Sequence, residues 1–442
     1  MKHSARPGTA AILAAATAVA LAACSTSPSK VPTTAPQAVA AADGTGKTIT
    51  VWVMDGDYST ATLDAIDAAF TKATGAKVDL QIQQWDGITT KITTALATSN
   101  PPDVLDLGNT QVASFAATGG LADLTSYAAD LKQGQTWLSG LADPATVNGS
   151  LYAVPGFAGA RAVIYNKAMW AKAGVAAAPN SFDELTADLD KVKAANPAPD
   201  FSPLYLPGRD WYAGMQFVWD AGGDFATQSG GKWAGGLSSA QAQQGLADFK
   251  AFQNKYSSAA SQTLDTTTPD QTQLFADGKA GAIIATSGFI GKIEKANPKL
   301  TDADLGTFPL PGKRMTTQPV LLGGSDWGIA AKSTHTALAL EWAKIAAGPD
   351  IQENWVVGKD GWIPNNTSAD RAAINVVGDL KQSFFAAALN SKATPASANW
   401  AQVEGDKDPE ALFSAIASGS KSPAEAGKAF DSVVEKILNA GG

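Results

Sequence analysis

The sequence predicts an α/β protein built from two lobes, and three observations support this. Strand-type and helix-type hydrophobic patterns alternate over residues 47–108. Removal of a 23-residue leader from the 442 residues leaves 419, more than one ordinary hydrophobic core supports. Residues 151–174 hold two short apolar runs separated by Pro155 and Gly156, where a chain can leave one packed unit for another. A strand–loop–helix within one domain is the alternative interpretation of this stretch.

The N-terminus has the pattern of a cleaved secretion signal. Lys2 and Arg6 precede an apolar run, residues 10–23, too short to span a bilayer as a mature helix. The run ends in LAAC, and Cys24 is the only cysteine, so no intrachain disulfide can form. The motif resembles a bacterial lipobox, which implies a signal peptide over residues 1–23 and a lipid on Cys24. A plain signal peptide with an incidental cysteine is the alternative.

Residues 24–46 are rich in Ser, Thr, Pro, Ala and Gly, without an apolar period. Such a segment buries too little surface to offset its chain entropy, so we expect a lipidated, disordered tether. Without Lys2 and Arg6, 31 of the 33 basic residues remain against 41 acidic ones, a formal charge of −10. With no basic cluster, nucleic acid is excluded as a partner. No later apolar run is long enough to span a membrane, so the lipid on Cys24 is the expected anchor.

The first lobe begins with alternating strands and helices. We expect strands at residues 47–53, 77–82 and 102–108, and helices at residues 60–74 and 87–99. Strands joined by such helices pair in parallel through right-handed crossovers. Ligands of these sheets bind beyond the carboxyl ends of the strands. The candidate ligand-binding residues at those ends are Asp55, Asp57, Trp85, Asp86, Asn109 and Thr110.

Several motifs spread over the body resemble one known family. The motifs are Y-x-V-P and I-Y-N-K-x-x-W-x-K-A-G within residues 151–174, P-P-D-V at 101–104, S-F-D-E-L at 181–185, F-A-D-G-K-A-G-A-I-I-A at 275–285, P-L-P-G at 309–312, G-G-S-D-W-G-I-A at 323–330 and P-x-x-x-N-W at 395–400. Together they resemble the family 1 extracellular solute-binding proteins of ABC sugar importers, from about residue 47 to the C-terminus. MDGD at 54–57 and QQWDGI at 83–88 look most like actinobacterial chito-oligosaccharide binders.

The resemblance implies a two-lobed, periplasmic-binding-protein-like fold with discontinuous lobes and a hinge that the chain crosses three times. The crossings are expected near residues 154–157, 309–312 and 362–365, each of which contains proline or glycine. The expected lobes are therefore residues 47–155 with 312–363, and residues 156–311 with 364–442. A surface turn is the alternative use of each Pro–Gly pair.

The body offers little for catalysis or metal binding. Its only histidine, His335, lies in a helical stretch, and no nucleotide-binding fingerprint is present. Glu404, Asp406 and Asp408 lie close together in VEGDKD, which we interpret as a solvated acidic turn. We therefore expect no catalytic residue, no metal and no cofactor.

All twelve tryptophans lie in the body, and several follow polar loop residues. An aromatic face can stack on the C–H face of a pyranose while nearby Asp, Asn and Gln bind its hydroxyls. Core packing is the alternative for any single tryptophan. Some tryptophans do not continue the apolar spacing of a buried helix or strand face, and these are Trp85, Trp211, Trp327, Trp362 and Trp400.

The resemblance also implies site residues in both lobes. It places Asp55, Asp57, Asn109 and Thr110 in loops of the first lobe. It places Asp210, Trp211 and Tyr212 where the family uses an acid and an aromatic residue, Phe289 where relatives often have a tryptophan, and Trp400 on a stacking tryptophan. The expected walls are Asp55, Trp85, Asn109 and Trp327 on one side and Trp211, Tyr212, Phe289 and Trp400 on the other.

The sequence therefore predicts a monomeric receptor on the extracellular face of the cell membrane. It would bind a sugar or oligosaccharide, with chito-oligosaccharide favoured, and deliver it to ABC permease subunits. Two alternatives stay open, a secreted carbohydrate-active enzyme and a receptor for another solute such as glycerol phosphate or a peptide.

Overall fold

The computed structural model describes residues 35–40 and 42–440, so the predicted signal peptide and Cys24 lie outside the described residues. The last part of the predicted tether differs from the expectation of disorder. Gln37 N–H donates to Ser126 O at 2.7 Å, and Val39 N–H donates to the Asp130 carboxylate at 2.8 Å. The Val39 side chain is buried against the first lobe. These contacts extend the folded body back to about residue 36.

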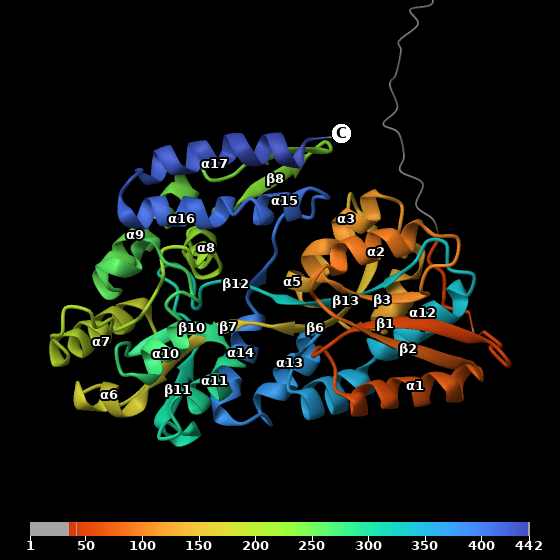
Figure 1. Ribbon diagram of the computed structural model, residues 1–442, viewed down its shortest axis with the longest axis horizontal. Coiled ribbons are helices and arrows are strands. Elements are labelled where there is room, and N and C mark those ends of the chain that lie inside the picture. The colour runs from red at the N-terminus through yellow and green to blue at the C-terminus, as the bar shows by residue number, and fades with distance from the viewer. Residues whose placement is uncertain (1–34, 41, 441–442) are drawn as a thin grey trace, which may run out of the picture. The chain divides into compact units, whose positions relative to one another are not determined.

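The first lobe is built on a six-stranded sheet with the order β14-β6-β13-β3-β1-β2 (Figure 1). β1 pairs in parallel with β2 and β3, whereas β13 and β14 run antiparallel to their partners. The strands are β1 (Thr48–Met54), β2 (Lys77–Gln83), β3 (Val104–Gly108), β6 (Ala153–Gly159), β13 (Gly323–Ile329) and β14 (Ile363–Pro364). The accompanying helices are α1 (Thr60–Thr74), α2 (Ile88–Ala97), η1 (Asn109–Gln111), α3 (Val112–Ala117), η2 (Thr125–Tyr127), α4 (Ala128–Lys132), α5 (Ser139–Ala142), α12 (Thr336–Ala346) and the π-helix η5 (Ile351–Asp360).

The predicted strands and helices of this lobe are confirmed, and their local causes are visible. Ser59 Oγ accepts a hydrogen bond from Thr62 N–H at the start of α1, and Gly75 ends the helix with a left-handed φ of 72°. Leu63, Ile66 and Phe70 follow the helical period and are buried. The parallel pairing brings the carboxyl ends of β1, β2 and β3 to one edge of the sheet.

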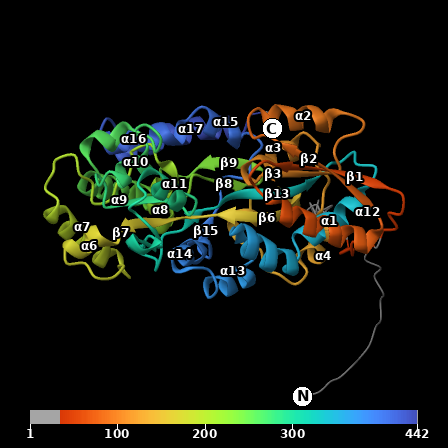
Figure 2. The same cartoon turned by 60° about the horizontal axis from the view of Figure 1, so that its bottom comes forward.

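The second lobe contains a three-stranded sheet, β10-β7-β11 (Figure 1), and Figure 2 shows β7 with helices around it. Its strands are β7 (Arg161–Asn166), β10 (Ala282–Thr286) and β11 (Leu305–Phe308). Its helices are α6 (Lys167–Lys172), α7 (Phe182–Ala195), α8 (Trp211–Asp220), α9 (Ala240–Tyr256), η3 (Ala259–Thr263), α10 (Gln271–Ala276), α11 (Phe289–Ala296), η4 (Asp302–Asp304), α13 (Thr367–Ile374), α14 (Asp379–Ala388), α15 (Trp400–Gly405), α16 (Asp408–Ser418) and α17 (Pro423–Leu438). Three two-stranded ladders complete the fold, β4 (Thr146–Val147) with β5 (Ser150–Leu151), β8 (Ala226–Ser229) with β9 (Lys232–Gly235), and β12 (Val320–Leu321) with β15 (Ser391–Lys392).

Extended strands carry the chain between the two sheets. β6 pairs in the first sheet up to Gly159 and β7 pairs in the second from Arg161, which leaves only Ala160 between them. β12 and β13 are likewise separated only by Leu322. We propose lobe boundaries at Ala160, where the ladder hydrogen bonds pass from the first sheet to the second, and at Leu322, where they pass from the β12–β15 ladder to the first sheet. The third proposed boundary lies after β14, the last strand of the first sheet along the chain.

We propose that the segment at residues 309–312, one of the predicted crossings, belongs to the second lobe. The main-chain N–H groups of Lys313, Arg314 and Met315 donate to the Asp220 carboxylate at the end of α8, at 3.0–3.3 Å. These bonds hold the segment to α8, so the chain leaves the lobe about ten residues later than its Pro–Gly pattern suggested.

A buried carboxyl in α13 gives the fold a testable pH dependence. Asp370 is 0% exposed, and neither carboxyl oxygen has a hydrogen-bond partner among the described residues. Burial raises the pKa of Asp370 from 3.8 to about 8. Between about pH 4 and pH 8 the folded state therefore binds a proton that the unfolded state lacks, and the free energy of unfolding falls as pH rises through this window.

We expect Asp370→Asn to raise the melting temperature by roughly several degrees at pH 8 and to leave it unchanged near pH 4, since each pKa unit corresponds to about 1.4 kcal/mol. Thermal unfolding followed by circular dichroism at both pH values measures this. Asp64→Asn, on the exposed side of α1, is the control and should match the wild type. Equal melting shifts for Asp370→Asn at pH 4 and pH 8 would contradict the assignment.

Candidate functional site

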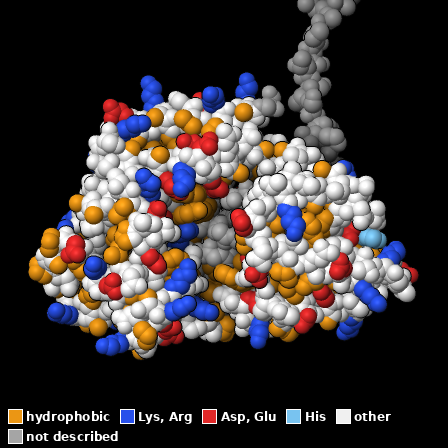
Figure 3. Space-filling model, in the orientation of Figure 1, with side chains coloured by type: hydrophobic (Ala, Val, Ile, Leu, Met, Phe, Trp, Pro, Cys, Tyr) orange, Lys and Arg blue, Asp and Glu red, His pale blue; other side chains and the backbone are white. Residues whose placement is uncertain are grey.

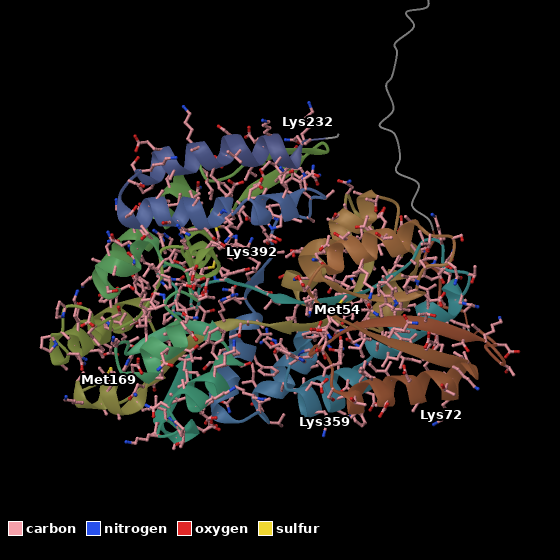
Figure 4. The ribbon with its side chains drawn as sticks, in the orientation of Figure 1. Met54, Lys72, Met169, Lys232, Lys359 and Lys392 are labelled. Atoms are coloured by element: carbon pink, nitrogen blue, oxygen red, sulfur yellow. The ribbon has the colours of Figure 1, made fainter. Side chains whose placement is uncertain are left out.

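A cavity of about 470 Å³ lies between the two lobes. Figure 3 shows this face of the molecule hollowed between them. In Figure 4, Met54 at the carboxyl end of β1 lies toward the second lobe, whereas Lys72 near the end of α1 lies on the outer side. The cavity is lined by Asp57, Trp85, Gly108, Asn109, Thr110, Gln111, Phe157, Gly159, Arg161, Tyr212, Thr286, Leu321, Leu322, Gly323, Gly324, Ser325, Trp362 and Glu404.

The carboxyl edge of the first sheet supplies much of one wall. Asp57 follows β1, Trp85 follows β2 and Asn109 follows β3, so the parallel pairing brings the three loops together. Asn109 is buried, and its Nδ2 donates to Gly140 O at 3.3 Å and to Leu322 O at 3.0 Å. Its amide group thus ties the loop after β3 to the crossing between β12 and β13.

Asp57 connects this wall to three other segments of the chain. Its carboxylate accepts hydrogen bonds from Ser325 Oγ at 2.6 Å and from Trp85 Nε1 at 3.3 Å. Its main-chain oxygen accepts from Trp362 Nε1 at 2.7 Å. Burial raises the pKa of Asp57, while the hydrogen bonds from Ser325 and Trp85 act in the opposite direction.

Aromatic and charged side chains form the wall of the second lobe. Tyr212 stacks on Trp211 with ring centroids 4.0 Å apart, and the Arg161 guanidinium lies 4.0 Å from the centre of the Tyr212 ring. Glu404 Oε1 accepts a 2.7 Å hydrogen bond from Trp400 Nε1. Burial raises the pKa of Glu404. Asp210 is the N-cap of α8 and accepts a hydrogen bond from Ala213 N–H, so its side chain stabilises the start of the helix.

The structure brings together only part of the predicted site. The predicted residues that line the cavity are Asp57, Trp85, Asn109, Thr110, Tyr212 and Trp362. The predicted residues outside the lining are Asp55, Asp86, Asp210, Trp211, Phe289, Trp327 and Trp400. Asp55 and Asp86 are exposed, and Phe289 begins α11, where Lys292 lies 4.4 Å from its ring centre.

Three tryptophans expected to present an open face are buried instead. Trp211 is 5% exposed, with its ring centre 4.0 Å from that of Tyr212 and 5.7 Å from that of Phe225. Trp327 is 1% exposed in a central strand, between Tyr58 and Trp342 at centroid distances of 5.1 and 4.7 Å. Trp400 is 0% exposed and packs against Phe225 at 5.1 Å. All three indoles are part of the buried hydrophobic clusters of the lobes.

The sequence interpretation missed Phe157, Arg161 and Glu404 in the cavity lining. Glu404 was assigned to a solvated acidic turn, yet it lies four residues after Trp400 on α15. That spacing places it on the same helix face as the tryptophan, which was an available signal. Arg161 and Phe157 lie on the strands that cross between the lobes, and nothing in their local pattern marks them.

The described residues contain no group of three or more His, Cys, Asp or Glu side chains placed to hold a metal ion. None of the helices in residues 35–40 and 42–440 is long and apolar enough to cross a membrane. The lining offers aromatic faces, two carboxylates, two amides, hydroxyls and a guanidinium. Such a set suits a polar solute that also has apolar faces.

Two α/β lobes with a ligand-sized cavity between them are the architecture of a solute receptor. Residues 56–353 match the sequence profile described as bacterial extracellular solute-binding protein, and the chain belongs to this family. It is 37% identical over 402 residues to the diacetylchitobiose binding protein DasA of Streptomyces coelicolor, covering 90% of this chain and 92% of the relative.

Solved structures share the fold. The sugar-binding protein MalE of Xanthomonas citri superposes with a TM-score of 0.76 at 21% identity, covering 89% of this chain and 97% of that chain. A cyclo/maltodextrin-binding protein complexed with maltotetraose has a TM-score of 0.73 at 18% identity, with 89% and 98% covered. The predicted two-lobed fold and the predicted family are therefore confirmed.

Proposed function

We propose that this chain is the extracellular substrate-binding component of an ABC importer and that it binds a chito-oligosaccharide between its lobes. The cavity between the lobes, lined by aromatic rings and hydrogen-bonding groups, is the observation that carries the proposal. Trp85, Tyr212 and Trp362 are the proposed stacking faces. The similarity to a diacetylchitobiose binding protein over most of both chains supports this choice of sugar.

The polar lining suits an N-acetylated sugar. An acetamido group presents one N–H donor and one carbonyl acceptor, and the sugar hydroxyls present both. Carboxylates at Asp57 and Glu404 supply acceptors, while the Arg161 guanidinium supplies donors. Closure of the lobes excludes water and strengthens these hydrogen bonds, so binding favours the closed form by the difference in affinity between the two forms.

A ligand panel tests the proposal. We expect saturable calorimetric binding of diacetylchitobiose at one site per chain, and at least about tenfold weaker binding of maltose, since losing even one buried polar contact costs about 1.4 kcal/mol or more. Cellobiose is the matched control, because it lacks the acetamido groups. Equal affinity for cellobiose and diacetylchitobiose would contradict recognition of the acetamido group.

We also propose that the chain binds its sugar without cleaving it. A glycosidase needs two carboxyl groups free to act on the scissile bond. Both Asp57 oxygens accept hydrogen bonds from the protein, and Glu404 accepts one from Trp400. Chromatography of chito-oligosaccharides after prolonged incubation should show unchanged sugar, whereas shorter products would favour the enzyme alternative.

We propose lipid anchoring at Cys24, on the extracellular face of the membrane, from the LAAC motif. We expect Cys24→Ala to release most of the protein from the membrane fraction or to block its maturation. Fractionation and immunoblotting measure this, with Ser25→Ala as the control. An unchanged membrane-bound amount of processed Cys24→Ala protein would rule out the lipobox. We further propose that the protein is a monomer and delivers its sugar to the permease subunits of the importer.

A further inference from the structure

Asp57 contacts three segments that are far apart in the sequence. Its carboxylate accepts from Ser325 Oγ in β13 and from Trp85 Nε1 after β2. Its main-chain oxygen accepts from Trp362 Nε1, just before β14. The single N–H group of each tryptophan that lines the cavity therefore donates to Asp57. No other described residue accepts a hydrogen bond from both indoles.

We propose that Asp57 is a positioning residue of the sugar site, which orients the Trp85 and Trp362 indoles before the ligand arrives. That the ligand of this site is a sugar depends on the function proposed above. Trp85 is 41% exposed, so packing restrains its ring less than that of a core tryptophan. Ordering such a side chain during binding costs about 0.5–1.5 kcal/mol, and the hydrogen bond to Asp57 removes much of this cost beforehand.

A second carboxyl lies beneath Asp57. Asp106 in β3 is 0% exposed, and its Oδ2 accepts from Met54 N–H at 3.1 Å. Burial raises the pKa of Asp106 well above its ordinary value, and the neighbouring Asp57 charge adds to the effect. No ion pair of the described residues includes either carboxyl. The other titratable and charged groups around the pair are Tyr58 after β1, Asp326 in β13 and Asp360 in η5, with Arg161 and Glu404 across the cavity.

The geometry makes the orientation of Trp85 sensitive to acid. An ionised Asp57 offers one oxygen to Ser325 and the other to Trp85, whereas a protonated carboxyl keeps a single good acceptor. The Ser325 hydroxyl can reverse and accept from a protonated Oδ2, whereas the Trp85 N–H can only donate and loses its partner when the proton is on Oδ1. Because burial raises the pKa of Asp57, this change begins at a higher pH than for an exposed aspartate. Sugar affinity should fall as the pH is lowered through that range.

Asp57→Asn tests the role, because asparagine has nearly the same shape but only one acceptor oxygen. Indole N–H resonances of the full-length, sugar-free protein are recorded against pH, with Trp85→Phe identifying the Trp85 signal. We expect this signal to move on acidification in the wild type and to stay constant in Asp57→Asn. Diacetylchitobiose affinity at pH 7 should fall about tenfold in Asp57→Asn and lose its acid dependence.

Two further variants separate the outcomes. Trp85→Phe keeps a stacking face without the N–H group, and it should weaken the acid dependence of sugar affinity. Asp64→Asn should behave as the wild type in both measurements. A Trp85 signal that ignores pH in the wild type, or that titrates equally in Asp57→Asn, overturns the proposal. If Asp57→Asn does not fold, unchanged acid dependence in Trp85→Phe overturns it instead. The indole resonances are recorded without ligand. A protein that binds no sugar would therefore contradict the proposed function and not the role of Asp57 in orienting Trp85.

Discussion

Replacing Trp400 with alanine is expected to lower the free energy of unfolding by about 3–5 kcal/mol, the usual effect of removing a large buried aromatic side chain. The indole is fully buried, packs against Phe225 and donates its N–H to Glu404. Its removal leaves a cavity between α15 and the helices around it and takes away the hydrogen-bond donor to Glu404. This loss is a large part of the total stability of an ordinary domain, which is about 5–15 kcal/mol.

Denaturant unfolding of the sugar-free protein measures this effect. Trp85→Ala is the matched control, because its indole is 41% exposed and should contribute little to the stability of the free protein. A Trp400→Ala variant that is as stable as the wild type but has lost sugar affinity would contradict the assignment of Trp400 to the core. Trp400 would then be the stacking face that the family resemblance implied.

Replacing Trp85 with alanine is expected to weaken diacetylchitobiose binding about tenfold to a hundredfold, because the loss of one buried aromatic contact costs about 1–3 kcal/mol. Trp85 lines the cavity at the end of β2, and its N–H group is held by Asp57. The bound sugar would cover the ring face that is exposed in the free protein. Trp85→Phe retains an apolar face and should fall between the wild type and Trp85→Ala.

Calorimetry with diacetylchitobiose measures the affinities, and Trp52→Ala is the control. Trp52 is a half-buried tryptophan of β1 that lies outside the cavity lining, with its N–H group donating to Gln81 at 3.0 Å. Its replacement should leave sugar affinity unchanged. If Trp85→Ala binds as tightly as the wild type, the stacking faces are Tyr212 and Trp362 alone.

The first lobe could be predicted from the sequence because its signals are local. The alternation of Ile49, Val51 and Val53 and the helical spacing of Leu63, Ile66 and Phe70 lie within single elements, as do the cap at Ser59 and the stop at Gly75. The proposed crossings differ from the predicted ones because Pro–Gly pairs also make turns. At residues 309–312 the deciding contact is the Asp220 carboxylate, from a helix about 90 residues earlier.

The site was only partly predictable for the same reason. Asp57, Trp85 and Asn109 follow parallel strands, so topology alone brings them to one edge. Whether a tryptophan faces the cavity depends on distant partners. Trp327 lies between Tyr58 and Trp342, which come from other parts of the chain. Glu404 could have been recognised only with Trp400 as its helix neighbour.

If Ala160 and Leu322 are lobe boundaries, as proposed above, these single residues between paired strands are the pivots for rotation of the two lobes. The backbone is held by ladder hydrogen bonds on each side, so a rotation is absorbed over very few dihedral angles. Asn109, in the wall of the cavity, donates to the main-chain oxygen of Leu322 and so links the site to one of these pivots. The measured affinity is the intrinsic affinity of the closed form multiplied by the fraction of molecules that are closed. Ala160 is not itself in the cavity lining but lies between two lining residues, Gly159 and Arg161, and we expect its backbone freedom to affect how tightly the sugar is held.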